Sequence, residues 1–287
     1  MKISTTAKSG DAGVLLVDTH VHIYDCYDLD ALFDAAVANL ARAARRLGLA
    51  ARKHECMLLL TETVNDHYFD SLAGGQRQPR RWRAERTAEP AVLKLVLAGQ
   101  PVMWLVAGRQ IATREDLEIL ALGTTERFLD GESIGESLAK VDRSAAITAL
   151  PWGFGKWWGR RGAIIKQLMS ASRDRPLYAG DNGGRLGLST RPRLLQFGEQ
   201  RGHKVLPGTD PLPFQGQETR VGTFGMLISD WQATDRPLER LAARLAALPK
   251  SPVEFGGLTG LLPFVKLQIA MQMRKRARRG SATHNGQ

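Results

Sequence analysis

The stretch VLLVDTHVH, residues 14–22, joins a short apolar run to a pair of histidines. Four consecutive apolar residues are typical of a strand that is buried on both faces, as in a parallel sheet. His20 and His22 follow, and side chains two residues apart on an extended chain point to the same side. The stretch therefore predicts a buried strand that brings two imidazoles toward one point.

A helix and a second strand follow this stretch. From Asp30 to Leu47 apolar residues recur at helical spacing, and Gly48 is a stop signal. Residues 56–60 are again an apolar run, so the order is that of a βαβ unit. Further strands are expected at 102–106, 117–122, 145–150, 177–179 and 204–206, and further helices at 157–170 and 238–248. This alternation predicts an α/β fold, specifically a TIM-like (β/α) barrel that is distorted and seven-stranded.

The length of 287 residues suits one large domain. We expect a single barrel over residues 14–257, with an Arg-rich loop insertion at about 70–95. Residues 258–279 combine an apolar stripe with a basic end, which predicts a C-terminal basic amphipathic helix. Residues 280–287 are expected to form a disordered tail.

Composition limits the classes of site and partner. Forty Lys and Arg against 29 Asp and Glu give a net charge of +11, which favours anionic partners. Two cysteines exclude a Cys-rich zinc module and a multi-disulfide scaffold, so a metal site would need His and carboxylate ligands. Neither a secretory signal nor a membrane-length apolar run is visible, so we expect a cytoplasmic protein.

Polar residues placed after predicted strands are the candidate metal ligands. Gln110 follows the strand at 102–106, and Asp210 follows the strand at 204–206. The carboxyl ends of barrel strands share one face, so both residues could meet His20 and His22 there. Two neutral imidazoles and a carboxylate suit one divalent cation, zinc or manganese.

The general acid or base is sought among the remaining polar residues at these strand ends. Glu62 follows the second strand, His67 lies a few residues further on, and Asp181 follows the strand at 177–179. Each could exchange a proton with a substrate or water. The alternative for an Asp in such a place is a turn or a helix cap.

Two Gly-rich stretches suggest how an anionic substrate could bind. In PWGFGKWWGRR, residues 151–161, Trp152 could stack on a sugar or base, while Lys156 and Arg160 could hold a phosphate or carboxylate. Arg185 ends GDNGGR, which could form an anion-binding nest. The alternatives stay open: aromatic side chains that cover the core, solvated cations and a tight turn.

Several motifs carry a resemblance to known families. DTHVH, residues 18–22, resembles the opening H-x-H motif of amidohydrolase-type barrels and of the polymerase and histidinol phosphatase (PHP) family. Residues 107–113 with 118–123, residues 147–153 and residues 208–212 are similar to later PHP motifs, in family order. The resemblance implies a metal-dependent hydrolase on a barrel scaffold.

The chain also departs from the PHP pattern. The resemblance implies three metals held mainly by histidines, with a glutamate that bridges two of them. Gln110 stands at that glutamate position, Leu150 and Leu212 stand at histidine positions, and Glu118 or no residue matches a further histidine. Leucine does not bind metals, and a neutral amide does not bridge two cations as a carboxylate does. We therefore expect one metal ion, or none, beside the histidine pair.

Three functions compete at this point. The first is a metal-dependent hydrolase that uses a metal-activated water on a phosphoester or other anionic substrate. The others are an amidohydrolase-like enzyme that cleaves C–N or C–O bonds, and a non-catalytic barrel that binds a ligand or serves as a scaffold. The basic C-terminal helix could make a weak contact with an anionic membrane. The sequence supports no specific nucleic-acid binding.

Overall fold

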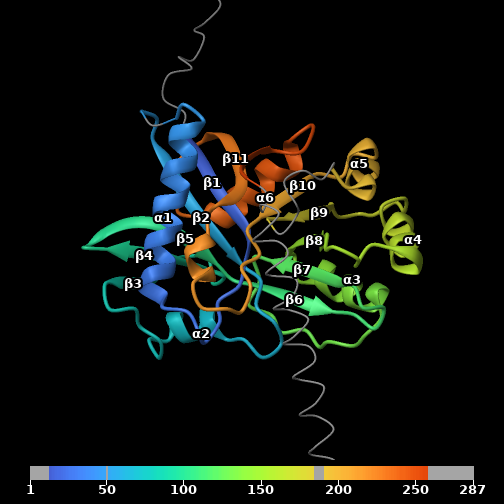
Figure 1. Cartoon of the computed structure of the whole chain (residues 1–287), viewed down its shortest axis with the longest axis horizontal. Coiled ribbons are helices and arrows are strands. Elements are labelled where there is room, and N and C mark those ends of the chain that lie inside the picture. Colours follow the sequence, from blue (N-terminus) through green and yellow to red (C-terminus); the bar gives the residue numbers. More distant parts are fainter. Residues whose placement is uncertain (1–12, 50, 184–190, 258–287) are drawn as a thin grey trace, which may run out of the picture.

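The computed structural model describes residues 13–49, 51–183 and 191–257 (Figure 1). Seven strands form a first sheet, in the order β12-β11-β1-β2-β5-β4-β3. Their bounds are β1 Gly13–Val21, β2 His54–Leu60, β3 Trp82–Arg86, β4 Val92–Leu97, β5 Gln100–Val106, β11 Phe224–Trp231 and β12 Val253–Gly256. Five strands form a second sheet, in the order β10-β9-β8-β7-β6. Their bounds are β6 Gly108–Ala112, β7 Glu118–Leu122, β8 Ile147–Pro151, β9 Leu177–Asn182 and β10 Val205–Gly208.

The described ranges contain six α-helices. They are α1 Leu29–Arg46, α2 Tyr68–Ala73, α3 Ile134–Arg143, α4 Gly159–Leu168, α5 Arg193–Gln200 and α6 Pro237–Ala247. Five pack on the outer faces of these sheets, and α6 packs through Leu241 and Leu245 on the apolar cluster between them. Helix α1 lies along the first sheet, and α3, α4 and α5 flank the second (Figure 1). A 3-10 turn at Gln217–Arg220 precedes β11.

The predicted TIM-like, seven-stranded (β/α) barrel is wrong. The fold is α/β, but it consists of two mixed sheets that no continuous strand ladder closes into a barrel. Strand pairs β4–β5, β6–β7 and β7–β8 are antiparallel, as is β1–β11. The reason lies in the connections: two residues join β4 to β5, whereas parallel neighbours need a crossover of a dozen or more residues.

The individual strand and helix predictions were more successful than the barrel. The seven predicted strands coincide with β1, β2, β5, β7, β8, β9 and β10, and the three predicted helices that the structure describes coincide with α1, α4 and α6. The basic helix expected at 258–279 and the tail at 280–287 lie outside the described residues. Among the residues that are described, no helix is long and apolar enough to cross a bilayer.

Apolar side chains fill the space between the two sheets. Leu15 and Val17 of β1 pack there with Met57 of β2, Leu120 of β7 and Tyr178 of β9. These residues alternate along their strands with others that pack against the outer helices. The buried interior therefore holds the two sheets face to face.

Two narrow contacts join the sheets near the carboxyl ends of β1 and β2. On one side the Glu62 N–H donates to the Gly108 carbonyl at 3.0 Å, and the Gln110 N–H donates to the Glu62 carbonyl at 2.8 Å. On the other side the Asp210 N–H donates to the His20 carbonyl at 2.8 Å. Residues from both sheets thus meet at one end of the molecule.

The Arg-rich segment after α2 is paired with acidic residues of the first helix and the loop before it. The ion pairs are Arg77–Asp25, Arg80–Asp28 and Arg81–Asp34. Asp30, which is buried, accepts hydrogen bonds from the backbone N–H groups of Arg80 and Arg81. Part of the positive charge counted in the sequence is therefore neutralised within the fold.

Candidate metal centre

A buried aspartate positions the end of β1 against the end of β10. Asp18 accepts hydrogen bonds from the N–H groups of His20 at 3.2 Å, Thr209 at 2.8 Å and Gly222 at 2.8 Å. The Thr209 hydroxyl donates to the same carboxylate at 2.5 Å. The two bonds from Thr209 tie the histidine-bearing strand to the residue that precedes Asp210. Sequence reasoning did not single out Asp18 or Thr209, although DTH and GTD occur in the motifs that it used.

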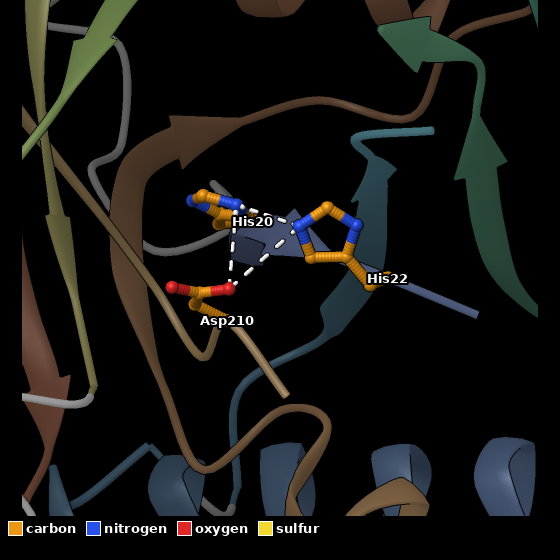
Figure 2. A group of neighbouring side chains, drawn as sticks. All are labelled: His20, His22 and Asp210. Carbon is orange, nitrogen blue, oxygen red and sulfur yellow. Dashed lines mark hydrogen bonds and ion pairs between the residues drawn. The ribbon is translucent and has the colours of Figure 1, made fainter. Parts of the chain in front are cut away.

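His20, His22 and Asp210 lie close together (Figure 2), and Gln110 reaches the same cluster. The two imidazole Nε2 atoms are 3.1 Å apart, and Gln110 Oε1 is 3.2 Å from Nε2 of His20. Asp210 Oδ1 lies 3.6 Å from Nε2 of His20 and 3.7 Å from Nε2 of His22. Both histidines are only 4% exposed.

The Asp210 carboxylate is held in place from two directions. Its backbone adopts a φ of 50°, in the left-handed region that Asp tolerates better than most residues. Asn182, at the end of β9, donates from Nδ2 to Asp210 Oδ2 at 2.9 Å, which turns Oδ1 toward the imidazoles. Asn182 was missed because its sequence context, Gly-Asp-Asn-Gly, is typical of a turn.

The electrostatics of the cluster favour the protonation states that bind a cation. Burial and the neighbouring His20 lower the pKa of His22 to about 4, so its imidazole is neutral at neutral pH. Burial opposes ionisation of Asp210, but His20, His22 and Lys156 together lower its pKa below the usual value. A neutral imidazole and a carboxylate are the forms that coordinate metals.

The donor set fits one divalent cation of the zinc type. Four tetrahedral ligand atoms at zinc bond lengths of about 2.0–2.1 Å lie about 3.3 Å from one another. The contacts among the imidazole, carboxylate and amide atoms of this cluster range from 3.1 to 3.7 Å. Nδ1 of His22 is buried without a hydrogen-bond partner among the described residues, so packing orients this ring, with Tyr24 stacked on it at 5.6 Å.

A cavity of about 630 Å³ opens beside the cluster. His22, Gln110 and Asp210 contribute to its wall, together with Lys156 and Glu118. This volume lies within the range of small-molecule binding pockets. The cluster therefore borders a space that could hold a substrate.

The three predicted acid–base residues lie outside the lining of this cavity. Glu62 is 2% exposed; its carboxylate accepts from Arg109 Nη1 at 2.7 Å and from the Phe69 N–H at 2.7 Å. Burial raises the pKa of Glu62 to about 7, although both of these donors lower it. His67 is exposed at the start of α2, and Asp181 is buried on the face of β9 that packs against the outer helices.

The predicted substrate-binding residues have different positions. Lys156 lines the cavity, with Nζ 2.5 Å from Glu118 Oε1. Trp152 is half-buried and packs against the apolar cluster under the helices of the second sheet. Arg160 is exposed in the first turn of α4, and Arg185 lies outside the described residues.

Comparison with known proteins supports the fold. No family model matches the chain, and no curated protein matches it. The crystal structure of PsfC from Pseudomonas syringae PB-5123 is similar, with 14% identity and a TM-score of 0.50 over 82% of this chain and 100% of that chain. Two further structures are those of the lesion-specific endonuclease PfuEndoQ from Pyrococcus furiosus and of Endonuclease Q with a 27-mer duplex containing an abasic lesion.

The two endonuclease structures are more distant from this chain. They show 11% and 9% identity and TM-scores of 0.47 and 0.46 over 79% of this chain, which spans 56% and 57% of their lengths. At such identities the likeness concerns the fold alone. The likeness to PsfC, at 14% identity, is likewise one of overall fold.

Proposed function

We propose that this chain is a metal-dependent hydrolase that acts on a phosphoester or other anionic substrate. One observation carries the proposal: two imidazole nitrogens, a carboxylate oxygen and an amide oxygen converge beside a cavity of about 630 Å³. All four groups can donate an electron pair to a cation. Their placement from two separate sheets makes a chance cluster of unrelated structural residues a poor explanation.

His20, His22, Asp210 and Gln110 would hold one divalent cation, zinc or manganese. A cation bound there would act as a Lewis acid and make water nucleophilic at neutral pH. The chain would contribute two imidazoles, one carboxylate and one amide, and Asn182 and Asp18 keep Asp210 and His20 in place. Ligands fixed by further hydrogen bonds bind metals more tightly than loose ones.

Substrate binding would depend first on Lys156, because its ammonium group lies in the cavity wall next to Glu118. Trp152, Arg160 and Arg185 are proposed to assist in substrate binding. Proton transfer is assigned to Glu62, His67 or Asp181 as predicted from the sequence. A substrate that reaches them must extend beyond the cavity lining, since none of the three belongs to it.

Elemental analysis of the purified chain, prepared in zinc or manganese, tests the proposal. We expect about one metal per chain, lost in His20→Ala and in Asp210→Ala. His54→Ala is the matched control, because His54 lies at the start of β2, away from the cluster, and its ring Nδ1 contacts the Arg52 carbonyl. Absence of metal from the wild-type chain, or its retention in both variants, would refute the metal site.

Hydrolysis of p-nitrophenyl phosphate and p-nitrophenyl acetate tests the reaction class. The metal-loaded chain is expected to hydrolyse the phosphoester, and both ligand variants are expected to lose this activity. A stoichiometric metal without hydrolysis of any member of a wider ester panel would contradict the enzymatic part of the proposal.

A further inference from the structure

The carboxylates of the cavity wall differ in their charge balance. Four of them line it: Asp25, Asp66, Glu118 and Asp210. Three have a cationic or imidazole partner: Arg77 for Asp25, Lys156 for Glu118, and His20 and His22 for Asp210. Asp66 is different, because no ion pair to it is found in the part of the chain that the structure describes. Its negative charge is thus left for a ligand to balance.

Asp66 is also held in a fixed orientation. The Thr63 N–H donates to Asp66 Oδ2 at 3.1 Å, and the Thr63 hydroxyl donates to the same oxygen at 2.6 Å. Both bonds use one oxygen of the carboxylate, so Oδ1 takes no part in them. The negative charge of Asp66 also acts on His22. It raises the pKa of His22 and so opposes part of the lowering caused by burial and by His20.

Aromatic rings stand in the same wall as Asp66. Tyr24 and Tyr68 both line the cavity, and the Tyr24 ring is stacked on His22 with centroids 5.6 Å apart. A guanidinium already lies over the Tyr68 ring, with Arg77 Cζ 4.7 Å from its centroid. A carboxylate beside aromatic rings is the combination that recognises ammonium groups in proteins.

We propose that the substrate carries an ammonium group in addition to its anionic group, and that Asp66 binds the ammonium. The inference rests on the proposed function, in which the anionic group lies toward the cation site and Lys156. A purely anionic substrate would bring like charge toward Asp66, which costs energy in a half-buried site. A substrate with both charges satisfies both parts of the cavity.

Two probes that differ only in the ammonium group test this proposal: O-phosphoethanolamine and ethyl phosphate. Their affinities for the zinc-loaded full chain are measured by isothermal titration calorimetry. We expect O-phosphoethanolamine to bind about tenfold more tightly, as for a hydrogen bond between charged groups. Asp66→Asn preserves the size of the side chain and is expected to make the two affinities equal.

Asp230→Asn is the matched control, since Asp230 is an exposed residue of β11 paired with Arg244. It should keep the tenfold ratio. Thermal unfolding and metal content of Asp66→Asn show whether the variant is folded and loaded; Thr63→Val, which removes one donor to Asp66, is expected to reduce the ratio without abolishing it.

Equal affinities in the wild-type chain, no binding of O-phosphoethanolamine, or a ratio that persists in Asp66→Asn would each overturn the proposal. These outcomes are separate from failure of the proposed function, which is read from metal content and hydrolysis. The affinity ratio can be measured in a chain that binds metal but does not turn over either probe.

Discussion

Gly208 shows how closely the backbone of β10 approaches His20, the first candidate metal ligand. A Cβ at this position would lie 2.4 Å from the His20 nitrogen and 2.5 Å from the His20 Cβ, distances that real atoms do not adopt. The strand and the histidine can be adjacent only because residue 208 has no side chain. The glycine of the GTD motif is therefore part of what places His20.

We predict that Gly208→Ala displaces His20 and weakens metal binding. The overpacking should lower the free energy of unfolding by about 1–3 kcal/mol. Urea unfolding and metal content measure the two effects. Gly135→Ala is the control, because a Cβ there would meet nothing within 4 Å in helix α3. Normal metal content in Gly208→Ala would show that the strand adjusts without moving the ligand.

At the scale of single residues, the sequence predicted the residues that cluster as candidate metal ligands but not the groups that orient them. The spacing of His20 and His22 is a local property of one strand, so it could be recognised directly. Asp18 and Asn182 act through partners 191 and 28 positions away in the chain, and local spacing contains no information on such contacts. Glu62 was placed at the correct strand end, yet its partner Arg109 was not foreseen.

Among the secondary-structure elements, β6 illustrates why the barrel prediction failed. Its sequence, GRQIA, lacks an apolar run, because Arg109 is buried against Glu62 and Gln110 reaches His20. The predicted strands have apolar runs that enter the interior, although β11, which also enters it through Met226 and Ile228, was not predicted. A strand that serves the polar site does not show the hydrophobic pattern, so the antiparallel pair β6–β7 was read as one strand after a loop.

The Arg109–Glu62 pair is predicted to be essential for this edge of the fold. Arg109→Met would leave the Glu62 carboxyl buried without its cation, which costs about 3–5 kcal/mol of unfolding free energy. Urea denaturation measures the loss. Arg127→Met, at an exposed arginine paired with Asp70, should change stability by less than about 1 kcal/mol. A similarly small loss in Arg109→Met would argue against a structural role for the pair.

Asp30 joins helix α1 to the Arg-rich segment, and we expect its contribution to the free energy of unfolding to depend on pH. Burial alone would raise the pKa of the Asp30 carboxyl. The hydrogen bonds from the N–H groups of Arg81 and Arg80 have the larger combined effect, so the pKa lies below its usual value of 3.8. The carboxylate therefore contributes its full stabilisation above pH 3.8, and the contribution is lost as the pH falls through the lowered pKa. Asp30→Asn should cost about 1–3 kcal/mol at pH 7. Unfolding curves of the wild-type chain and of Asp30→Asn, measured at pH 7 and in acid, test this. A difference in unfolding free energy that did not shrink in acid would contradict it.

In the whole molecule, the candidate metal ligands come from both sheets. His20 and His22 lie at the end of β1 in the first sheet, whereas Gln110 belongs to β6 and Asp210 follows β10 in the second. Among the described residues of this region, a few backbone hydrogen bonds join the sheets, together with the bonds from Thr209 to Asp18. A cation held by all four residues would therefore link the two sheets where backbone pairing is sparse.

This arrangement predicts that metal stabilises the whole fold and does not act only locally. A ligand that binds the folded chain alone, at 100 times its Kd, adds about 2.7 kcal/mol to the free energy of unfolding. We expect the Tm to rise when zinc is added to the chelator-treated chain and to fall again with excess chelator. His54→Ala should keep this shift, and His20→Ala should lose it. An unchanged Tm despite stoichiometric metal would mean that the ion binds the folded and unfolded chains equally well, which would argue against a site assembled from all four residues.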